Sequence, residues 1–490
     1  MKVKSICLII LLASIAMNSF SQKKPVVEIE KLVTRREVEA PLTFLAADEM
    51  RGRDTGSPEL DIAANYIASW FQQLGLQTLP GADHYFQTVE LTKTSRIGNA
   101  ELKLKDDVFR FKDEFIVMEG GGEWKGECIY IGYGSAEEIP TDIKGKMVVS
   151  IVGSKESQGQ QIFEASNEKF ERVKAAGAAG LIEFFQTPPP FWLRVVSYFG
   201  DNKRVMIKST TAVVPHLWMS TSVGPGFSEL KEGKMVMGAL SIQGSTTISL
   251  PARNVIGKIE GIDPVLKNEH IVISAHYDHV GVGAKVNQDS IYNGARDNAL
   301  GTVGMLTAAT YFSKFPPKRS IIFMALTAEE KGLLGSEWYA DHPLVPLSQT
   351  VFDFDCDGAG YNDKTVATVI GLERTTAESN IVKACKAFGL KAGTDPVPEQ
   401  NLYERSDNYN FAKKGVPAID FATGVKSFDE ELMKYYHKPA DEVSTLDFEY
   451  LVKYYKAFVY ANQLIANDPK KPFWKAGDKF EPIGKELYKK

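Results

Sequence analysis

Histidines and carboxylates gather at the ends of short apolar runs in the second half of the chain. These side chains all lie in or beside the loops that follow such runs: His276, Asp278, Asp297, Glu329, Glu330, Asp355 and His437. Taken singly, none is specific, because a histidine at a strand end is usually structural, a glutamate pair is usually solvated and an aspartate before a helix is usually an N-cap. Their common placement at one edge of a predicted sheet indicates a functional site.

The ligand types in this set favour a divalent metal ion. Imidazole and carboxylate ligands without thiolates suit zinc or a similar ion. Two histidines and three carboxylates exceed what one tetrahedral site needs, so they suit a two-metal centre with one bridging carboxylate and an open position for water. Such a centre favours a bound hydroxide and polarises a carbonyl group.

Two further carboxylates suit supporting roles. Asp278 lies two residues after His276, where a carboxylate can orient the imidazole. Glu329 and Glu330 are adjacent, so their side chains point in different directions. One of them can bind metal while the other takes a proton from metal-bound water.

Strands and helices alternate through the region that carries these residues. From about residue 252, HIVISA and RSIIFMAL are typical of buried strands, GTVGMLTAATYFSKF is typical of a helix, and LDFEYLVKYYKAFVYANQLIAN predicts a long terminal helix. This alternation predicts an α/β domain with a mostly parallel or mixed sheet sandwiched by helices. The carboxyl ends of its strands would place the polar side chains at one edge.

The first half of the chain has a different character. Residues 41–77 have a helical pattern that is broken by RGRDTGSPE, where Gly52, Arg53 and Gly56 form either a functional loop or a capped turn. From about residue 86 to 250, short β-type runs surround one clear helix, FERVKAAGAAG. This stretch predicts a separate small domain.

Size and composition set the remaining limits. With 490 residues the chain is expected to form two domains, and its net charge of -5 gives no basic surface for nucleic acid. The basic start MKVK and the short apolar run ICLIILLASIAM predict a signal peptide over residues 1–22, and hence a secreted or periplasmic protein without membrane attachment after cleavage. An uncleaved anchor is disfavoured by the shortness of the run. Cys128, Cys356 and Cys385 would remain, and this odd number leaves at least one free thiol.

Five segments together resemble a known family. AHYDHVGV, NGARDNALGT, TAEEKGLLGS, FDFDCDG and YYHKPADE resemble, in this order and spacing, the motifs of the M28 zinc metallopeptidases, which include di-zinc aminopeptidases. LAADEMRGRDTGSPELDIAANYIASWFQQLGL resembles the opening segment of that family. The resemblance implies a zinc-exopeptidase fold of the phosphorylase/hydrolase-like type, in a catalytic domain divided between residues 23–95 and 248–467.

The resemblance also implies a ligand set for two Zn²⁺ ions. Asp297 would bridge both ions, with Glu330 and His437 completing one site and His276 and Asp355 the other. The peptide bond after Asp297 is often cis in this family.

The resemblance assigns the supporting residues as well. Glu329 would act as general base and then as general acid, and Asp278 would orient His276. His279 is not a ligand by this resemblance, and it is expected to be structural or to line the pocket wall.

The segment between the two parts of the catalytic domain has a resemblance of its own. DIKGKMVVSIVG, FERVKAAGAAGLIEFF and AVVPHLWMS resemble a protease-associated (PA) domain, inserted over residues 96–247. Such domains carry no catalytic residues, so His216 is expected to be structural. Residues 468–490 are expected to be a surface tail.

Three positions depart from the family pattern. Asn408 stands where histidine is common, Asp353 where asparagine is usual, and Cys356 where methionine is typical. The first of these puts substrate contacts in doubt. A thiol beside zinc can be reactive, but a buried inert cysteine is favoured.

The expected function is therefore a secreted, zinc-dependent aminopeptidase acting on peptides, with metal-activated hydroxide as nucleophile and Glu329 as base. Alternatives on the same scaffold are a carboxypeptidase, a dipeptidase or a glutaminyl cyclase. A carboxypeptidase needs a cation for the substrate carboxylate, and Arg296 and Arg405 are candidates. A receptor-like relative without catalysis is disfavoured, because every ligand position and Glu329 are present.

Overall fold

The structure of the chain is a computed structural model that describes residues 24–489 except 96, 158–160, 186–188, 201–203, 209–212, 221–224, 245 and 359. The predicted signal peptide, residues 1–22, lies outside the described residues. The chain divides into two compact units, one formed by residues 24–89 and 251–489 and the other by residues 90–250. The segment expected to be inserted, residues 96–247, falls inside the second unit.

The first unit is built on one mixed sheet. Its strands, in spatial order, are β18 (Lys391–Gly393), β17 (Val366–Ile370), β19 (Ala418–Thr423), β16 (Thr350–Asp355), β12 (His270–His276), β15 (Ser320–Leu326), β11 (Thr247–Ile259) and β1 (Phe86–Thr94). The central strands β15, β12, β16 and β19 are parallel, whereas β11 and β17 each run antiparallel to a neighbour. The predicted mixed sheet between helices is confirmed.

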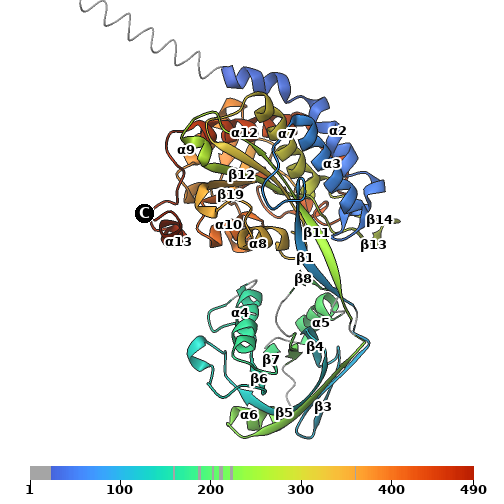
Figure 1. Ribbon diagram of the computed structural model, residues 1–490. Helices are drawn as coiled ribbons and strands as arrows, with labels where there is room; N and C mark the ends of the chain where they lie inside the picture. Colours follow the sequence, from blue (N-terminus) through green and yellow to red (C-terminus); the bar gives the residue numbers. More distant parts are fainter. Residues whose placement is uncertain are drawn as a thin grey trace, which may run out of the picture. The chain divides into compact units, whose positions relative to one another are not determined.

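Both faces of this sheet are covered, because successive strand residues point to opposite faces. Ile271 and Ile273 of β12 belong to one apolar cluster, and Val272 between them belongs to another. The first cluster packs under α2 (Arg35–Leu45), α3 (Pro58–Leu74), α7 (Leu300–Lys314), α9 (Glu378–Ala387) and α12 (Phe448–Asn467). The second packs against α8 (Leu334–Asp341) and α10 (Asn408–Lys413), which Figure 1 shows on the other side of the sheet.

The helix boundaries follow ordinary capping chemistry. Ser57 begins α3 by accepting a hydrogen bond from the Leu60 amide, with Pro58 at the first helical position. Gly75 ends the same helix in a left-handed conformation, φ 73°. Asp447 caps α12 through the amides of Glu449 and Tyr450.

Within the segment expected to be a surface tail, residues 468–490, the described residues 468–489 are partly buried. Trp474 is 2% exposed and donates a hydrogen bond to the Gly415 carbonyl at 2.9 Å. Arg374 lies 3.9 Å from the ring centroid of Tyr403 and pairs with Asp478 at 2.7 Å. The segment also contains α13 (Glu481–Leu487), which Figure 1 shows near the C-terminus.

The second unit has an eight-stranded sheet of its own. Its strands, in spatial order, are β3 (Asp107–Arg110), β2 (Asn99–Leu104), β10 (Val236–Gln243), β5 (Gly122–Tyr130), β6 (Met147–Ile151), β7 (Gly180–Phe185), β9 (His216–Ser220) and β4 (Phe115–Glu119). The helices of this unit are α4 (Gln161–Ala175), α5 (Pro189–Phe199) and α6 (Pro225–Lys231). Separately, β8 (Val205–Ile207) pairs with the end of β1, where Leu91 faces Ile207.

A buried ion pair lies in the core of the second unit. Lys169 of α4 and Glu183 of β7 are 1% and 0% exposed, and Lys169 Nζ lies 2.7 Å from Glu183 Oε1. His216 Nε2 lies 2.8 Å from Glu183 Oε2. Burial alone would raise the pKa of Glu183, but the contacts with His216 and Lys169 outweigh it and lower that pKa to about 2. The glutamate is therefore an anion, and Ser166 and Trp218 also donate hydrogen bonds to its Oε2.

The structure also describes the cysteines and the apolar character of the helices. Cys128, Cys356 and Cys385 are all buried free thiols, so no disulfide joins any two of them. Within the described residues, none of the helices combines the length and the apolar character that crossing a membrane requires.

Candidate metal centre

Three parallel strands of the first unit end at the same edge and deliver the candidate side chains. His276 is the last residue of β12 and lies level with Leu326, the last residue of β15. Glu329 and Glu330 follow β15 after two residues. Asp355 closes β16, where it pairs with Ser274 of β12. The parallel register is therefore what brings these segments together.

Two loops complete the arrangement. Asp297 lies in a short helical turn, Ala295–Ala299, directly before α7, and its peptide bond to Asn298 is cis. His437 follows the short helix α11 (Glu430–Met433) and has a positive φ of 49°.

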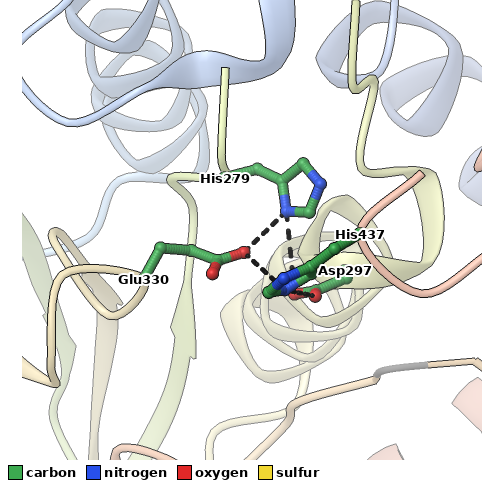
Figure 2. A group of neighbouring side chains, drawn as sticks. All are labelled: His279, Asp297, Glu330 and His437. Atoms are coloured by element: carbon green, nitrogen blue, oxygen red, sulfur yellow. Dashed lines mark ion pairs between the residues drawn. The ribbon is translucent and has the colours of Figure 1, made fainter. Parts of the chain in front are cut away.

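Four side chains form the first group: His279, Asp297, Glu330 and His437. One possible ligand atom from each lies within 4.8 Å of all the others. Figure 2 shows the two imidazoles and the two carboxylates facing one another. His437 Nε2 lies 3.0 Å from Asp297 Oδ2 and 3.3 Å from Glu330 Oε1, and His279 Nδ1 lies 2.8 Å from Glu330 Oε1.

Three side chains form the second group: His276, Glu329 and Asp357. His276 Nε2 lies 3.2 Å from Asp357 Oδ1 and 3.8 Å from Glu329 Oε2. The same nitrogen lies 3.4 Å from Asp297 Oδ1. Because the two oxygens of the Asp297 carboxylate face different groups, this residue lies between them.

Asp355, which the sequence analysis expected beside His276, lies outside both groups. Its Oδ2 accepts a hydrogen bond from Ser406 at 2.7 Å, and its Oδ1 lies 3.0 Å from Ser274 Oγ. The position near His276 is taken by Asp357, which lies two residues beyond the end of β16. The register explains the difference, because Ser274 pairs with Asp355 and His276 is two residues beyond Ser274.

His279 and Asp357 are the members of these groups that the sequence analysis did not select. His279 is fully buried, and neither of its ring nitrogens has a hydrogen-bond partner. The available signals were the third polar residue in AHYDH and the third aspartate in DFDCD. Neither signal shows which histidine or aspartate faces the centre.

Asp278 contacts its neighbours in two ways. Its carbonyl oxygen lies 3.2 Å from His276 Nδ1, closer than its carboxylate, whose Oδ1 is 4.0 Å from that nitrogen. The carboxylate accepts hydrogen bonds from the Glu329 amide at 3.1 Å and from Thr55 at 2.9 Å. Asp278 thus touches both the imidazole and the backbone of the neighbouring glutamate.

The positions that depart from the family pattern lie behind the two groups. The backbone amide of Asn408 donates a hydrogen bond to Asp355 Oδ2 at 3.3 Å, and Asp353 Oδ1 lies 2.8 Å from Ser274 Oγ. Cys356 is buried, with its sulfur 3.3 Å from the Tyr454 hydroxyl. Burial raises the pKa of the Cys356 thiol well above its usual range, so the thiol is held neutral.

Electrostatics separate the two adjacent glutamates. Burial raises the pKa of Glu329 well above its usual value, and the nearby His276 only partly opposes this. Burial acts in the same direction on Glu330, but His279 and His437 outweigh it and hold the pKa of Glu330 well below the usual value. Glu330 is therefore suited to remain an anion, whereas Glu329 is suited to carry a proton.

The donor set fits zinc. Nitrogen and oxygen ligands held about 2.0–2.1 Å from a tetrahedral metal are separated by about 3.3 Å, close to the separations of 3.0–3.4 Å that join Asp297 to His437 and His276. Glu330 Oε1 and the ring nitrogens of His279 are buried and make no hydrogen bond of ordinary geometry, although Oε1 lies only 2.8 Å from His279 Nδ1. Buried polar atoms that face one another in this way are atoms that a cation would satisfy.

Of the two arginines considered for a substrate carboxylate, one is already paired. Arg296 is 3% exposed and donates to Asp441 Oδ1 at 2.9 Å. Arg405 is partly exposed and donates to the Tyr436 hydroxyl at 3.1 Å. The Tyr436 ring stacks on His437 with a centroid separation of 4.2 Å, so Arg405 is the cation connected to the site.

The chain is similar to known peptidases. Residues 254–461 match the sequence model of Peptidase family M28. The aminopeptidase YwaD of Bacillus subtilis is 26% identical over 330 residues, which cover 65% of this chain and 62% of that protein. The vacuolar membrane protease of Lachancea thermotolerans is 33% identical over 201 residues, which cover 41% of this chain and 20% of that protein. The chain thus spans less than two thirds of the length of either relative.

A solved structure shares the fold. An aminopeptidase from Aneurinibacillus sp. strain AM-1 aligns with a TM-score of 0.58 and 20% identity, over 91% of this chain and 97% of that one. At this identity the likeness concerns the arrangement of sheet and helices.

Proposed function

Because residues 254–461 form a Peptidase family M28 domain, we propose that this chain is a zinc-dependent aminopeptidase that removes N-terminal residues from peptides. The observation that carries the proposal is the position of the Asp297 carboxylate, with Oδ2 3.0 Å from His437 and Oδ1 3.4 Å from His276. A carboxylate placed between two such groups suits a bridge between two metal ions. The activity named for the relative YwaD supports the reaction.

The proposal assigns two zinc sites. His279, Glu330 and His437 would hold one ion, and His276 and Asp357 the other, with Asp297 shared. Asp355 would support the second site from behind, through Ser274 and Ser406. Bound zinc supplies a Lewis acid for a substrate carbonyl group and lowers the pKa of a coordinated water.

The chain itself would move the proton. Glu329 reaches the second group, with Oε2 3.8 Å from His276 Nε2, and its raised pKa suits a group that accepts a proton and returns it to the leaving amine. Asp278 would hold Glu329 by its amide and His276 through a backbone carbonyl. His437, with 36% of its side chain exposed, would lie on the open side of the centre.

Two further assignments from the sequence belong to this proposal. Residues 1–22 would direct the protein to a secreted or periplasmic location. The second unit would be a protease-associated domain, a reading supported by its parallel strands β6 and β7 with α4 between them in the sequence.

The test is hydrolysis of matched peptides by the full chain. Zinc content is measured first, and then release of the N-terminal residue from free-amine peptides and from the same peptides with acetylated N-termini. Hydrolysis restricted to free amines, abolished by a chelator and restored by zinc, is the expected result. Zinc-free protein, or activity that is insensitive to chelation, refutes the proposal.

Arg405 favours one second candidate, a dipeptidase or carboxypeptidase. A guanidinium beside Tyr436 and His437 could bind a substrate carboxylate. A carboxypeptidase would cleave acetylated peptides with a free C-terminus, and amidation of that C-terminus would abolish cleavage by either enzyme. Cyclisation of an N-terminal glutamine in the same assay would instead identify a glutaminyl cyclase.

A further inference from the structure

The turn at residues 52–55, far from the candidate centre in sequence, contacts three segments that carry the proposed ligands and base. It precedes α3 and lies outside the region that matches the M28 family model, residues 254–461. Its side chains Arg53 and Thr55 are 1% and 2% exposed. A capped turn between two helices does not require two buried polar side chains, so their contacts need an explanation.

Arg53 connects two of the three segments. Its Nε donates to the Tyr277 carbonyl at 2.9 Å, directly after His276. Its Nη1 and Nη2 donate to the carbonyls of Asn293 at 2.8 Å and Gly294 at 3.0 Å, in the loop that leads to Asp297. A fourth acceptor, the Leu45 carbonyl, fixes the guanidinium to the end of α2. One planar group thus joins the backbones that present His276 and Asp297.

The backbone of the turn pairs with the same segment. The His279 amide donates to the Arg53 carbonyl at 3.2 Å, and the Gly281 amide donates to the Gly52 carbonyl at 3.1 Å. Gly52 has φ 68°, and a Cβ at that position would lie 2.6 Å from the Gly281 carbonyl oxygen. Only glycine allows the turn to approach so closely.

Thr55 and Asp54 reach the third segment. Thr55 Oγ1 donates to Asp278 Oδ2 at 2.9 Å, and the other oxygen of that carboxylate accepts the Glu329 amide at 3.1 Å. Asp54 Oδ1 lies 2.6 Å from Lys331 Nζ, two residues after Glu329. The turn therefore contacts the chain at both ends of the glutamate pair, at the Glu329 amide through Asp278 and at Lys331 directly.

Charge supports the same arrangement. Burial lowers the pKa of Arg53 to about 10, while Asp278, Asp297, Asp441 and Glu330 counteract that effect, so Arg53 remains a cation at neutral pH. A buried cation among these carboxylates offsets part of their mutual repulsion.

We propose that residues 52–55 form a positioning element of the catalytic centre, in which Arg53 fixes the His276 and Asp297 segments and Thr55 fixes Glu329 through Asp278. This inference rests on the proposed function. Arg53 acts on the geometry of the metal ligands, and Thr55 acts on the orientation of the base. Lysine cannot replace Arg53, because the three donors of an ammonium group share one nitrogen atom and cannot reach all four carbonyls.

The experiment uses the full chain and paired substitutions. Thr55→Val removes the hydroxyl at constant shape, Thr55→Ser restores it, and Thr43→Val is the matched control at an exposed threonine. Arg53→Lys is matched by Arg51→Lys in the same turn, where the Arg51 side chain is 57% exposed. For each variant, zinc affinity is measured by chelator competition, and kcat, KM and the pH profile of kcat are measured separately.

We expect Thr55→Val to lower kcat about 10- to 100-fold with an unchanged KM and a shifted pH profile, and Thr55→Ser to restore kcat. We expect Arg53→Lys to weaken zinc binding about 10- to 100-fold, with Arg51→Lys and Thr43→Val equal to wild type. Wild-type kcat and pH profile in Thr55→Val overturn the role of Thr55, even if Arg53→Lys fails to fold. Wild-type protein without zinc or activity would instead refute the proposed function itself.

Discussion

Asp357 Oδ1 lies 3.2 Å from His276 Nε2, in the place where the sequence analysis expected the carboxylate of Asp355. The two aspartates lie two residues apart, Asp355 at the end of β16 and Asp357 beyond it, but only Asp357 reaches the imidazole. Asp355 instead accepts a hydrogen bond from the Ser406 hydroxyl.

This relationship gives the first prediction. Asp357→Asn should reduce the zinc content from two ions to one, because it removes a proposed ligand. Asp355→Asn should retain two ions and weaken their binding by about 10- to 100-fold, as expected for a residue that supports ligands. Native mass spectrometry of the zinc-loaded protein distinguishes the two variants. The opposite pattern would restore Asp355 as the ligand.

Glu329 gives the second prediction. Glu329→Gln should keep both zinc ions and lower kcat by about 10²- to 10⁴-fold, because the amide cannot accept and return a proton. Glu373→Gln, at an exposed glutamate of the same unit, should leave kcat unchanged. Steady-state hydrolysis and metal analysis on the same preparations are the measurements. Near-normal turnover in Glu329→Gln would exclude it as the base.

Zinc binding should release protons. Burial would lower the pKa of His437, but Asp297 and Glu330 outweigh it and raise that pKa to about 10; the pKa of His276 is also raised well above its usual value. Both imidazoles are then protonated in metal-free protein at pH 7 and must lose a proton to bind metal. Affinity should therefore fall as the pH falls, and become independent of His437 only above pH 10.

Titration calorimetry in buffers of different ionisation enthalpy measures this release, and about two protons per protein are expected at pH 7. Equal binding enthalpies in all buffers would contradict the prediction.

The buried pair of the second unit gives a stability prediction. Lys169→Met should lower the free energy of unfolding by about 3–5 kcal/mol, because Glu183 would lose a partner while it stays fully buried. Lys103→Met is the control: its ion pair with Glu101 is about half exposed, and its loss should cost less than about 1 kcal/mol. Denaturant unfolding followed by fluorescence measures both. Equal stabilities of the two variants would argue against a contribution from the buried pair.

The sequence predicted the scaffold of the site better than its side-chain placement. The apolar runs before His276 and Glu329 are buried strands, because their residues alternate between two cores. Which aspartate meets His276 depends on the register of β16 against β12, and spacing within one strand carries no information on register.

His279 was passed over for a related reason. Its side-chain direction depends on the turn after β12, and the Arg53 carbonyl fixes the His279 amide in that turn. A contact between segments more than two hundred positions apart leaves no pattern that periodicity can detect. The same holds for Asp278, whose partner Thr55 lies in the N-terminal turn.

The two crossings between the units lie on adjacent strands. The chain leaves the first unit near Val89 on β1 and returns near Pro251 on β11, and these strands are neighbours in the sheet. A short turn could therefore join β1 to β11 and leave the strand order of the sheet unchanged. The second unit is thus inserted at a single point of the first, and exchanging residues 90–250 would leave the hydrogen bonds around Asp297 in place.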